Sequence, residues 1–86
     1  MRLEFTVIAQ KDLRKLDMIA QKQIARKLRF FMEQPDPLQF ATSLTNFTKG
    51  GSYRFRVGKY RIVFDVADDT VFVLHIEHRR DVYRRK

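Results

Sequence analysis

The stretch YRFRVGKYRIVFDV, residues 53–66, decides the fold because apolar and polar residues alternate on both sides of a short turn. Alternation with a period of two predicts strands that bury one face and expose the other. The turn is Gly58-Lys59, a two-residue loop of the kind that joins the strands of a tight β-hairpin. The second half of the chain is therefore predicted to contain an antiparallel hairpin.

The length of this loop fixes which residues face each other across the hairpin. Arg56 is predicted to lie directly opposite Arg61, with Arg54 on the same face. The other face carries only apolar and aromatic residues and is predicted to be the core face. They are Tyr53, Phe55, Val57, Tyr60, Ile62 and Phe64. Like charges that face each other destabilise a sheet, so the arginine pair predicts that an anion such as a phosphate binds between them.

A further strand, VFVLHIEH, follows the turn ADDT. We expect a three-residue loop, Asp68 to Thr70, because a two-residue loop would turn His75 and Glu77 into the core. With the longer loop, Phe64 faces Leu74 and apolar residues meet on the core face.

The outer face of the predicted sheet gathers charge from three strands. In this register Arg61 faces Glu77, a candidate orienting partner for the guanidinium groups. The converging arginines are Arg54, Arg56, Arg61 and Arg79. Fixed cations of this kind stabilise charge that develops on a phosphate. His78 could carry a proton beside them, although a structural role is the more common one for a histidine in a strand.

The first half of the chain predicts one strand and two helices. RLEFTVI alternates through Val7, as a half-buried strand does. Helical spacing begins near Ala9 and the first helix ends near Asp17, which is placed to cap a second helix from Met18 to Glu33. The core-facing stripe of that helix is Ile24, Leu28 and Phe31.

The order of these elements predicts an α+β fold in which the helices pack on one face of a single sheet. It comprises an N-terminal strand, a two-helix hairpin and three antiparallel strands. Pro35 and Pro37 end the second helix, and residues 38–52 are predicted to form an irregular connection. A length of 86 residues predicts a single domain, residues 1–86.

Composition narrows the class of function. A net charge of +8 and an isoelectric point near 10.3 predict an anionic partner, most simply a nucleic acid. The chain has no cysteine, and its histidines and carboxylates show no ligand spacing, so neither a metal site nor a cofactor is expected. The absence of cysteine fits a reducing cytoplasm. No apolar run approaches the roughly 20 residues of a membrane span, and no signal peptide is apparent.

The second half of the chain resembles the RelE/ParE superfamily of toxin–antitoxin toxins. The resemblance lies in YRFRVGKYRIVFDV and HRRDVYRR and is strongest over residues 53–85, while AQKDLRKLD and the longer helix after it suit the helical hairpin of that superfamily. It implies a fold close to that of small microbial ribonucleases, in the cytoplasm of a bacterium or archaeon, and a cognate antitoxin that wraps the toxin.

The two branches of the superfamily imply different activities. RelE-type toxins enter the ribosomal A site and cleave mRNA there, whereas ParE-type toxins inhibit DNA gyrase without nuclease chemistry. The full set of arginines together with Tyr83 favours the first, a ribosome-dependent endoribonuclease, whereas the second would be favoured by a longer helical hairpin than this one. The alternatives are gyrase inhibition and a catalytically degenerate member that only binds its antitoxin.

The resemblance to the RelE branch also implies roles for individual residues. The implied residues are Arg54, Arg56 and Arg80 for phosphate binding and Arg61, Arg79 and Tyr83 for catalysis. A slightly different alignment puts Arg80 in the place of Arg79. The implied reaction is metal-free: a 2′-hydroxyl of the RNA attacks the adjacent phosphate, expels the 5′-oxygen and leaves a 2′,3′-cyclic phosphate. Tyr83 would take the proton of the hydroxyl, because nearby arginines favour its phenolate form.

Overall fold

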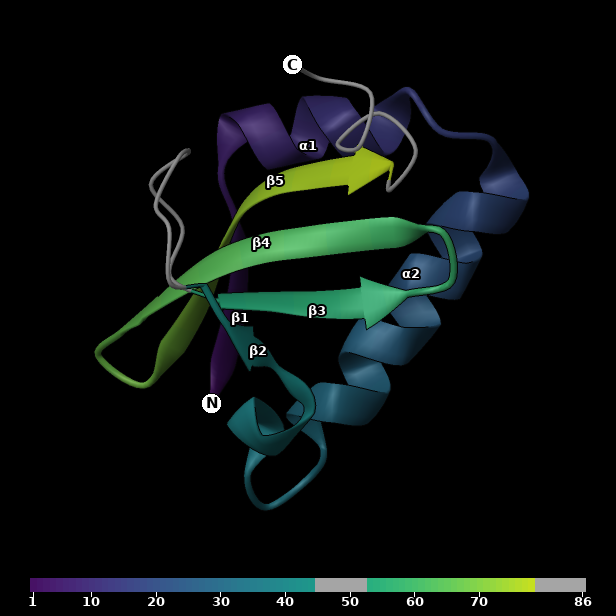
Figure 1. Cartoon of the computed structure of the whole chain (residues 1–86). Helices are drawn as coiled ribbons and strands as arrows, with labels where there is room; N and C mark the ends of the chain where they lie inside the picture. Colours follow the sequence, from purple (N-terminus) through teal and green to yellow (C-terminus); the bar gives the residue numbers. More distant parts are fainter. Residues whose placement is uncertain (45–52, 79–86) are drawn as a thin grey trace.

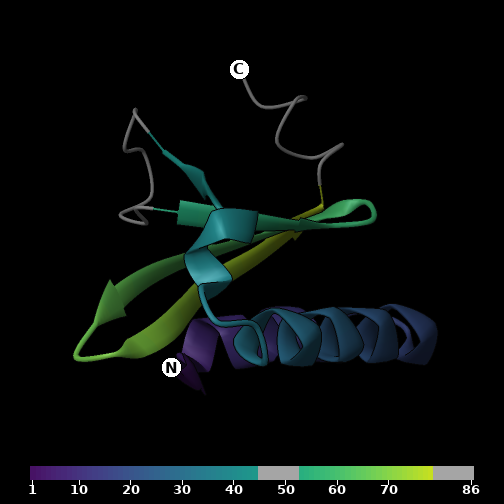
Figure 2. The same ribbon diagram turned by 90° about the horizontal axis from the view of Figure 1, so that it is seen from below.

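One mixed sheet and a layer of helices on one of its faces make up the described part of the chain (Figure 1, Figure 2). The computed structural model describes residues 1–44 and 53–78. The elements are β1 (Arg2–Phe5), α1 (Val7–Arg14), α2 (Met18–Met32), the 3-10 helix η1 (Pro37–Phe40), β2 (Thr42–Ser43), β3 (Tyr53–Val57), β4 (Tyr60–Ala67) and β5 (Thr70–His78). The predicted α+β architecture is confirmed.

The strand order is β1-β5-β4-β3-β2, with β1 parallel to β5 and the other neighbours antiparallel. The short strand β2 pairs with β3 inside the segment that was predicted to be an irregular connection. Two residues are too few to show an alternating pattern, so this strand has no signature in the sequence. Among the described helices, none is both long enough and apolar enough to cross a membrane.

The first hairpin has the predicted register. Arg56 lies opposite Arg61, and Phe55 lies opposite Ile62 on the buried face. Gly58 has a φ of 58°, which suits the first loop position of a type II′ turn and favours glycine there. The loop prediction for this hairpin is therefore confirmed.

The loop prediction for the second hairpin is wrong. The turn between β4 and β5 has two residues, Asp68 and Asp69, and both have positive φ, 50° and 59°. This is the pattern of a type I′ turn, which aspartate tolerates better than most residues do. As a result Phe64 lies opposite Val73 rather than Leu74.

A β-bulge restores the predicted pairing beyond this point. The register shifts between Val63 and Phe64, so Leu74 on β5 is an extra residue without a partner on β4. Because a bulge adds one residue to one strand, it reverses the faces of the residues that follow. His75 and Glu77 therefore stay on the outer face despite the two-residue loop.

Helix α1 holds β5 at the bulge. The hydroxyl of Thr6 donates to the carbonyl oxygen of Val73 at 3.0 Å and lies 3.3 Å from that of Leu74. The carboxylate of Asp12 accepts the backbone N–H of Ile76 at 3.0 Å. These bonds satisfy backbone groups of β5 close to the point where its partner β1 ends.

We expect Asp12→Ala to lower the free energy of unfolding by about 1–3 kcal/mol, because the N–H of Ile76 would lose its acceptor in a partly buried position. Urea denaturation followed by circular dichroism measures the change. Asp36→Ala is the matched control, since the side chain of Asp36 makes no capping hydrogen bond to η1. Equal losses in the two variants would contradict a specific role for Asp12.

The boundary between β1 and α1 differs from the prediction. The strand ends at Phe5, and Thr6 caps α1 by accepting the N–H of Ala9 at 3.2 Å. Val7, predicted to lie on the apolar face of this strand with Leu3 and Phe5, is instead the first helical residue and is 64% exposed. A cap by Thr6 thus overrides the alternation of the surrounding residues.

Helix α2 closes the core as predicted. Asp17 caps it by accepting the N–H of Ala20 at 2.8 Å, and the helix ends at Met32, with Glu33 as its C-terminal cap. The predicted stripe is buried, and Phe31 stacks on Phe55 at 4.5 Å between ring centroids. The apolar face of the sheet is thus covered by helix, and its other face carries the charged residues.

Candidate functional site

A row of charged residues crosses three strands on the sheet face that points away from the helices. Arg56 on β3 lies opposite Arg61 on β4, which in turn lies opposite Glu77 on β5. Residues that face each other directly in an antiparallel pair have Cβ atoms about 4.5–5.5 Å apart. Arg61 is therefore flanked by a cation on one side and an anion on the other.

A second row runs beside the first. Arg54 on β3 lies opposite Val63 on β4, and Val63 lies opposite His75 on β5. Val63 is buried, with 3% of its surface exposed, although it lies on the charged face. Val63 thus places an apolar side chain between Arg54 on one neighbouring strand and His75 on the other.

The arginines differ in their burial. Arg56 is exposed, whereas Arg54 and Arg61 are half-buried. Among residues 1–44 and 53–78, no group accepts a hydrogen bond from the buried Nε of Arg61. A buried donor without a partner requires an explanation, and an anionic ligand is one that suits a guanidinium group.

The structure brings together four of the predicted site residues: Arg54, Arg56, Arg61 and Glu77. His78 does not join them. It lies opposite Tyr60, and the two rings meet edge to face at 5.3 Å on the side of the sheet that the helices cover. The predicted site residues Arg79, Arg80 and Tyr83 lie outside the described residues.

His75 is the residue that the sequence prediction left out. His75 lies on the charged face, where the prediction expected His78 to carry a proton. Successive residues of a strand alternate between its two faces, so His75 shares a face with Glu77, and His78 lies on the other face. The register of Arg61 with Glu77 already contains this information, since His75 lies two residues from Glu77 on the same strand.

We expect Arg56→Thr to raise the free energy of unfolding by about 0.2–1 kcal/mol, because it removes a like charge directly opposite Arg61 and adds a residue that favours strands. Urea denaturation at low salt measures the change, and added salt should reduce it. Arg2→Thr is the matched control, since Arg2 is a strand arginine that lies opposite the uncharged Thr70. A loss of stability in Arg56→Thr alone would mean that the two arginines do not repel each other.

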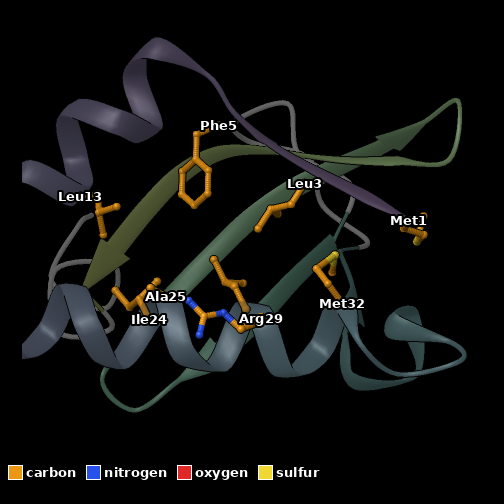
Figure 3. A pocket seen from close by; sticks show the side chains of 9 residues that line it. Met1, Leu3, Phe5, Leu13, Ile24, Ala25, Arg29 and Met32 are labelled. Atoms are coloured by element: carbon orange, nitrogen blue, oxygen red, sulfur yellow. The ribbon is translucent and has the colours of Figure 1, made fainter.

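An apolar groove lies on the opposite side of the sheet, between β1 and α2 (Figure 3). Its volume is about 430 Å³. Leu3 and Phe5 of β1 line one wall, and Ala25, Arg29 and Met32 of α2 line the other. Arg29 is the only charged side chain among its described lining residues, and Met1, which carries the N-terminal ammonium group, also lines it, so the groove offers apolar surface beside positive charge.

The fold places the chain among small α+β toxins. In the crystal structure of the toxin–antitoxin complex RelBE2 from Mycobacterium tuberculosis, the matching chain has a TM-score of 0.72 and 28% identity, over 91% of this chain and 96% of that one. In the intact RelBE toxin–antitoxin complex of E. coli, the matching chain has a TM-score of 0.68 and 27% identity, over 90% and 94%. The predicted similarity to RelE toxins is thus confirmed.

The family follows from the sequence comparison. The model of the ParE toxin of type II toxin–antitoxin systems, parDE, matches residues 3–83. Toxin RelG of Mycobacterium tuberculosis is 31% identical over 85 residues, which cover 96% of this chain and 95% of RelG. The chain belongs to the ParE toxin family and is a type II toxin of the RelE/ParE superfamily.

Proposed function

We propose that this toxin is a ribosome-dependent endoribonuclease that cleaves mRNA in the ribosomal A site. The observation that carries the proposal is the direct opposition of Arg56 and Arg61 across β3 and β4. Two guanidinium groups so placed repel each other, and the arrangement is favourable only when an anion lies between them. The phosphodiester of an RNA chain supplies such an anion at a spacing that repeats along the strand.

The proposed reaction needs no group beyond side chains and RNA. The 2′-oxygen forms a bond to the adjacent phosphorus, the bond from phosphorus to the 5′-oxygen breaks, and a 2′,3′-cyclic phosphate remains. Arg61 and Arg79 hold the charge that grows on the phosphate oxygens. Tyr83 takes the proton from the 2′-hydroxyl, a contribution typically worth about 10² to 10⁴ in rate.

The remaining residues position the RNA and the catalytic arginine. Glu77 lies opposite Arg61 on the neighbouring strand, and in the proposed complex with RNA its carboxylate would orient the guanidinium group. The residues proposed to bind the RNA backbone are Arg54, Arg56 and Arg80. Forked arginine contacts to phosphate suit this role better than the point charge of lysine.

Gyrase inhibition is the second candidate, because the family model that matches the chain describes the ParE toxin of parDE. In that case the arginine face would bind its target without breaking a bond. The two functions differ in their product, since one leaves cut mRNA and the other leaves intact mRNA and stalled gyrase on DNA.

We further propose that the toxin acts in the cytoplasm and that its partner is an antitoxin with an acidic, apolar segment. The matching chains of known structure are the toxins of RelBE toxin–antitoxin complexes. The groove between β1 and α2 offers apolar surface beside Arg29 on a chain of net charge +8, which complements such a segment. Ala25→Glu, which adds a negative charge to the groove, should weaken the complex isolated after co-expression.

One experiment separates the two functions. Wild-type toxin and the Tyr83→Phe variant are added to a translating extract, and the ends of the mRNA are mapped. Cuts that keep a fixed phase with the codons and disappear in Tyr83→Phe support the nuclease. Tyr53→Phe is the matched control, since Tyr53 stacks on Phe64 at 5.5 Å on the buried face. Intact mRNA together with gyrase trapped on plasmid DNA would refute the nuclease.

A further inference from the structure

The bulge in β5 determines which face His75 occupies. A two-residue turn followed by an unbroken ladder would place His75 opposite Ile62, a fully buried core residue. The extra residue Leu74 shifts the ladder by one, so that His75 lies opposite Val63 on the arginine face. Bulges are frequent beside active sites, where they re-aim a side chain.

His75 lies on the same face of the sheet as two of the arginines, Arg54 and Arg61. Arg61 is a diagonal neighbour of His75 because it lies opposite Glu77, and diagonal neighbours are roughly 7–8 Å apart, within the reach of long side chains. Arg54 lies two strands away in the same row, about 10 Å at the usual strand spacing. A phosphate above the buried Val63 would lie within reach of all three side chains.

We propose that His75 is the general acid of the cleavage reaction, a role that rests on the proposed nuclease function. As the bond between phosphorus and the 5′-oxygen breaks, the imidazolium of His75 gives its proton to that oxygen. The proton of the attacking 2′-hydroxyl leaves to the base, so one proton is taken up and one is released. Arg54 and Arg61 cannot supply this proton, because a guanidinium group does not lose it in proteins.

Positively and negatively charged residues both lie on the elements around His75. The ionisable groups on the elements packed around it include Arg54 on β3, Arg61 and Asp65 on β4, Glu4 on β1, Glu77 on β5 and Asp12 on α1, whose carboxylate accepts the N–H of the residue after His75. Histidine is the side chain whose charge ordinarily changes between pH 5 and 8.

The kinetic test compares the two histidines of the chain. Single-turnover cutting of a short mRNA on programmed ribosomes is measured from pH 5.5 to 8.5 for wild type, His75→Gln and His78→Gln. Relative to a protein without this acid, wild-type cutting should decline as the pH rises, because the acid loses its proton while the base Tyr83 is common to both proteins. His75→Gln should cut about 10²-fold more slowly and should lose this alkaline decline. His78→Gln should keep the decline, since His78 lies on the other face against Tyr60.

The outcomes separate the two proposals. Wild-type cutting with the same alkaline decline in His75→Gln overturns the role of His75 and leaves the nuclease intact. The role of His75 is also overturned if His78→Gln loses the alkaline decline of the cutting rate and His75→Gln keeps it. Absence of any cutting by wild type refutes the nuclease itself, and the acid role with it.

A binding measurement tests the location of His75 without any turnover. Inorganic phosphate is added to the free toxin while the ring signals of both histidines are followed by NMR. The signals of His75 should shift and saturate in wild type and should stay unchanged in Arg61→Ala, while those of His78 stay unchanged in both. A His75 ring that does not respond to phosphate would show that it lies outside the anion site.

Discussion

Arg61→Ala should slow the cutting of mRNA on the ribosome by about 10²–10³-fold while the protein stays folded. Arg61 is the central residue of the charged row, with Arg56 on one side and Glu77 on the other. Its buried Nε lacks a hydrogen-bond acceptor among the described residues, so the guanidinium group retains donors for a phosphate. In the proposed reaction its loss removes a fixed cation from the phosphate on which negative charge grows. Single-turnover cutting on programmed ribosomes measures the effect.

Two further variants make this result specific. Arg14→Ala removes the same charge from an exposed position on α1 and should cut at nearly the wild-type rate. Arg61→Lys keeps the charge but loses the forked geometry, so its rate should fall between those of wild type and Arg61→Ala. If Arg61→Ala and Arg14→Ala cut equally fast, the arginine face would not be the catalytic site.

The arginine face could be predicted from the sequence because a two-residue loop fixes the register of the first hairpin. Once Gly58-Lys59 is the turn, the opposition of Arg56 and Arg61 follows from the period of a strand. The faces of Phe55 and Ile62 follow in the same way, and both are fully buried. Short-range geometry alone decides these positions.

The bulge in β5 could not be predicted in this way. A three-residue loop without a bulge and a two-residue loop with a bulge both place Arg61 opposite Glu77, so the sequence pattern cannot distinguish them. The choice depends on the positive φ of Asp68 and Asp69 and on the bonds from Thr6 and Asp12 to β5. Thr6 and Asp12 are more than sixty positions away in the chain from the β5 residues that they contact, so no local sequence pattern reveals these bonds.

His75 was overlooked for a related reason. The prediction correctly rejected a buried His75, but it then considered proton transfer only for His78, which is adjacent in sequence to the arginines of the C-terminal segment. In a strand, adjacency in sequence means opposite faces. The residue two positions before Glu77 shares its face, and this residue is His75.

Phe55→Ala should lower the free energy of unfolding by about 3–5 kcal/mol, the largest stability effect that we expect. Phe55 is 0% exposed and is the middle ring of a stack, with Phe31 at 4.5 Å and Phe64 at 4.4 Å between centroids. Its removal would leave a cavity between α2 and the sheet. Because a chain of 86 residues is typically stable by about 4–13 kcal/mol, this loss would bring it close to unfolding. Urea denaturation followed by circular dichroism measures the change.

Phe30→Ala is the matched control for this prediction. Phe30 is 43% exposed and meets Phe31 edge to face at 5.9 Å, so its loss should cost less than about 1.5 kcal/mol. Similar losses in the two variants would mean that the ring stack does not carry the stability of the sheet. The contrast also bears on function, because Phe55 lies between Arg54 and Arg56 on β3. The burial of its ring holds the strand that presents both arginines, so partial unfolding of β3 should weaken phosphate binding before the rest of the protein unfolds.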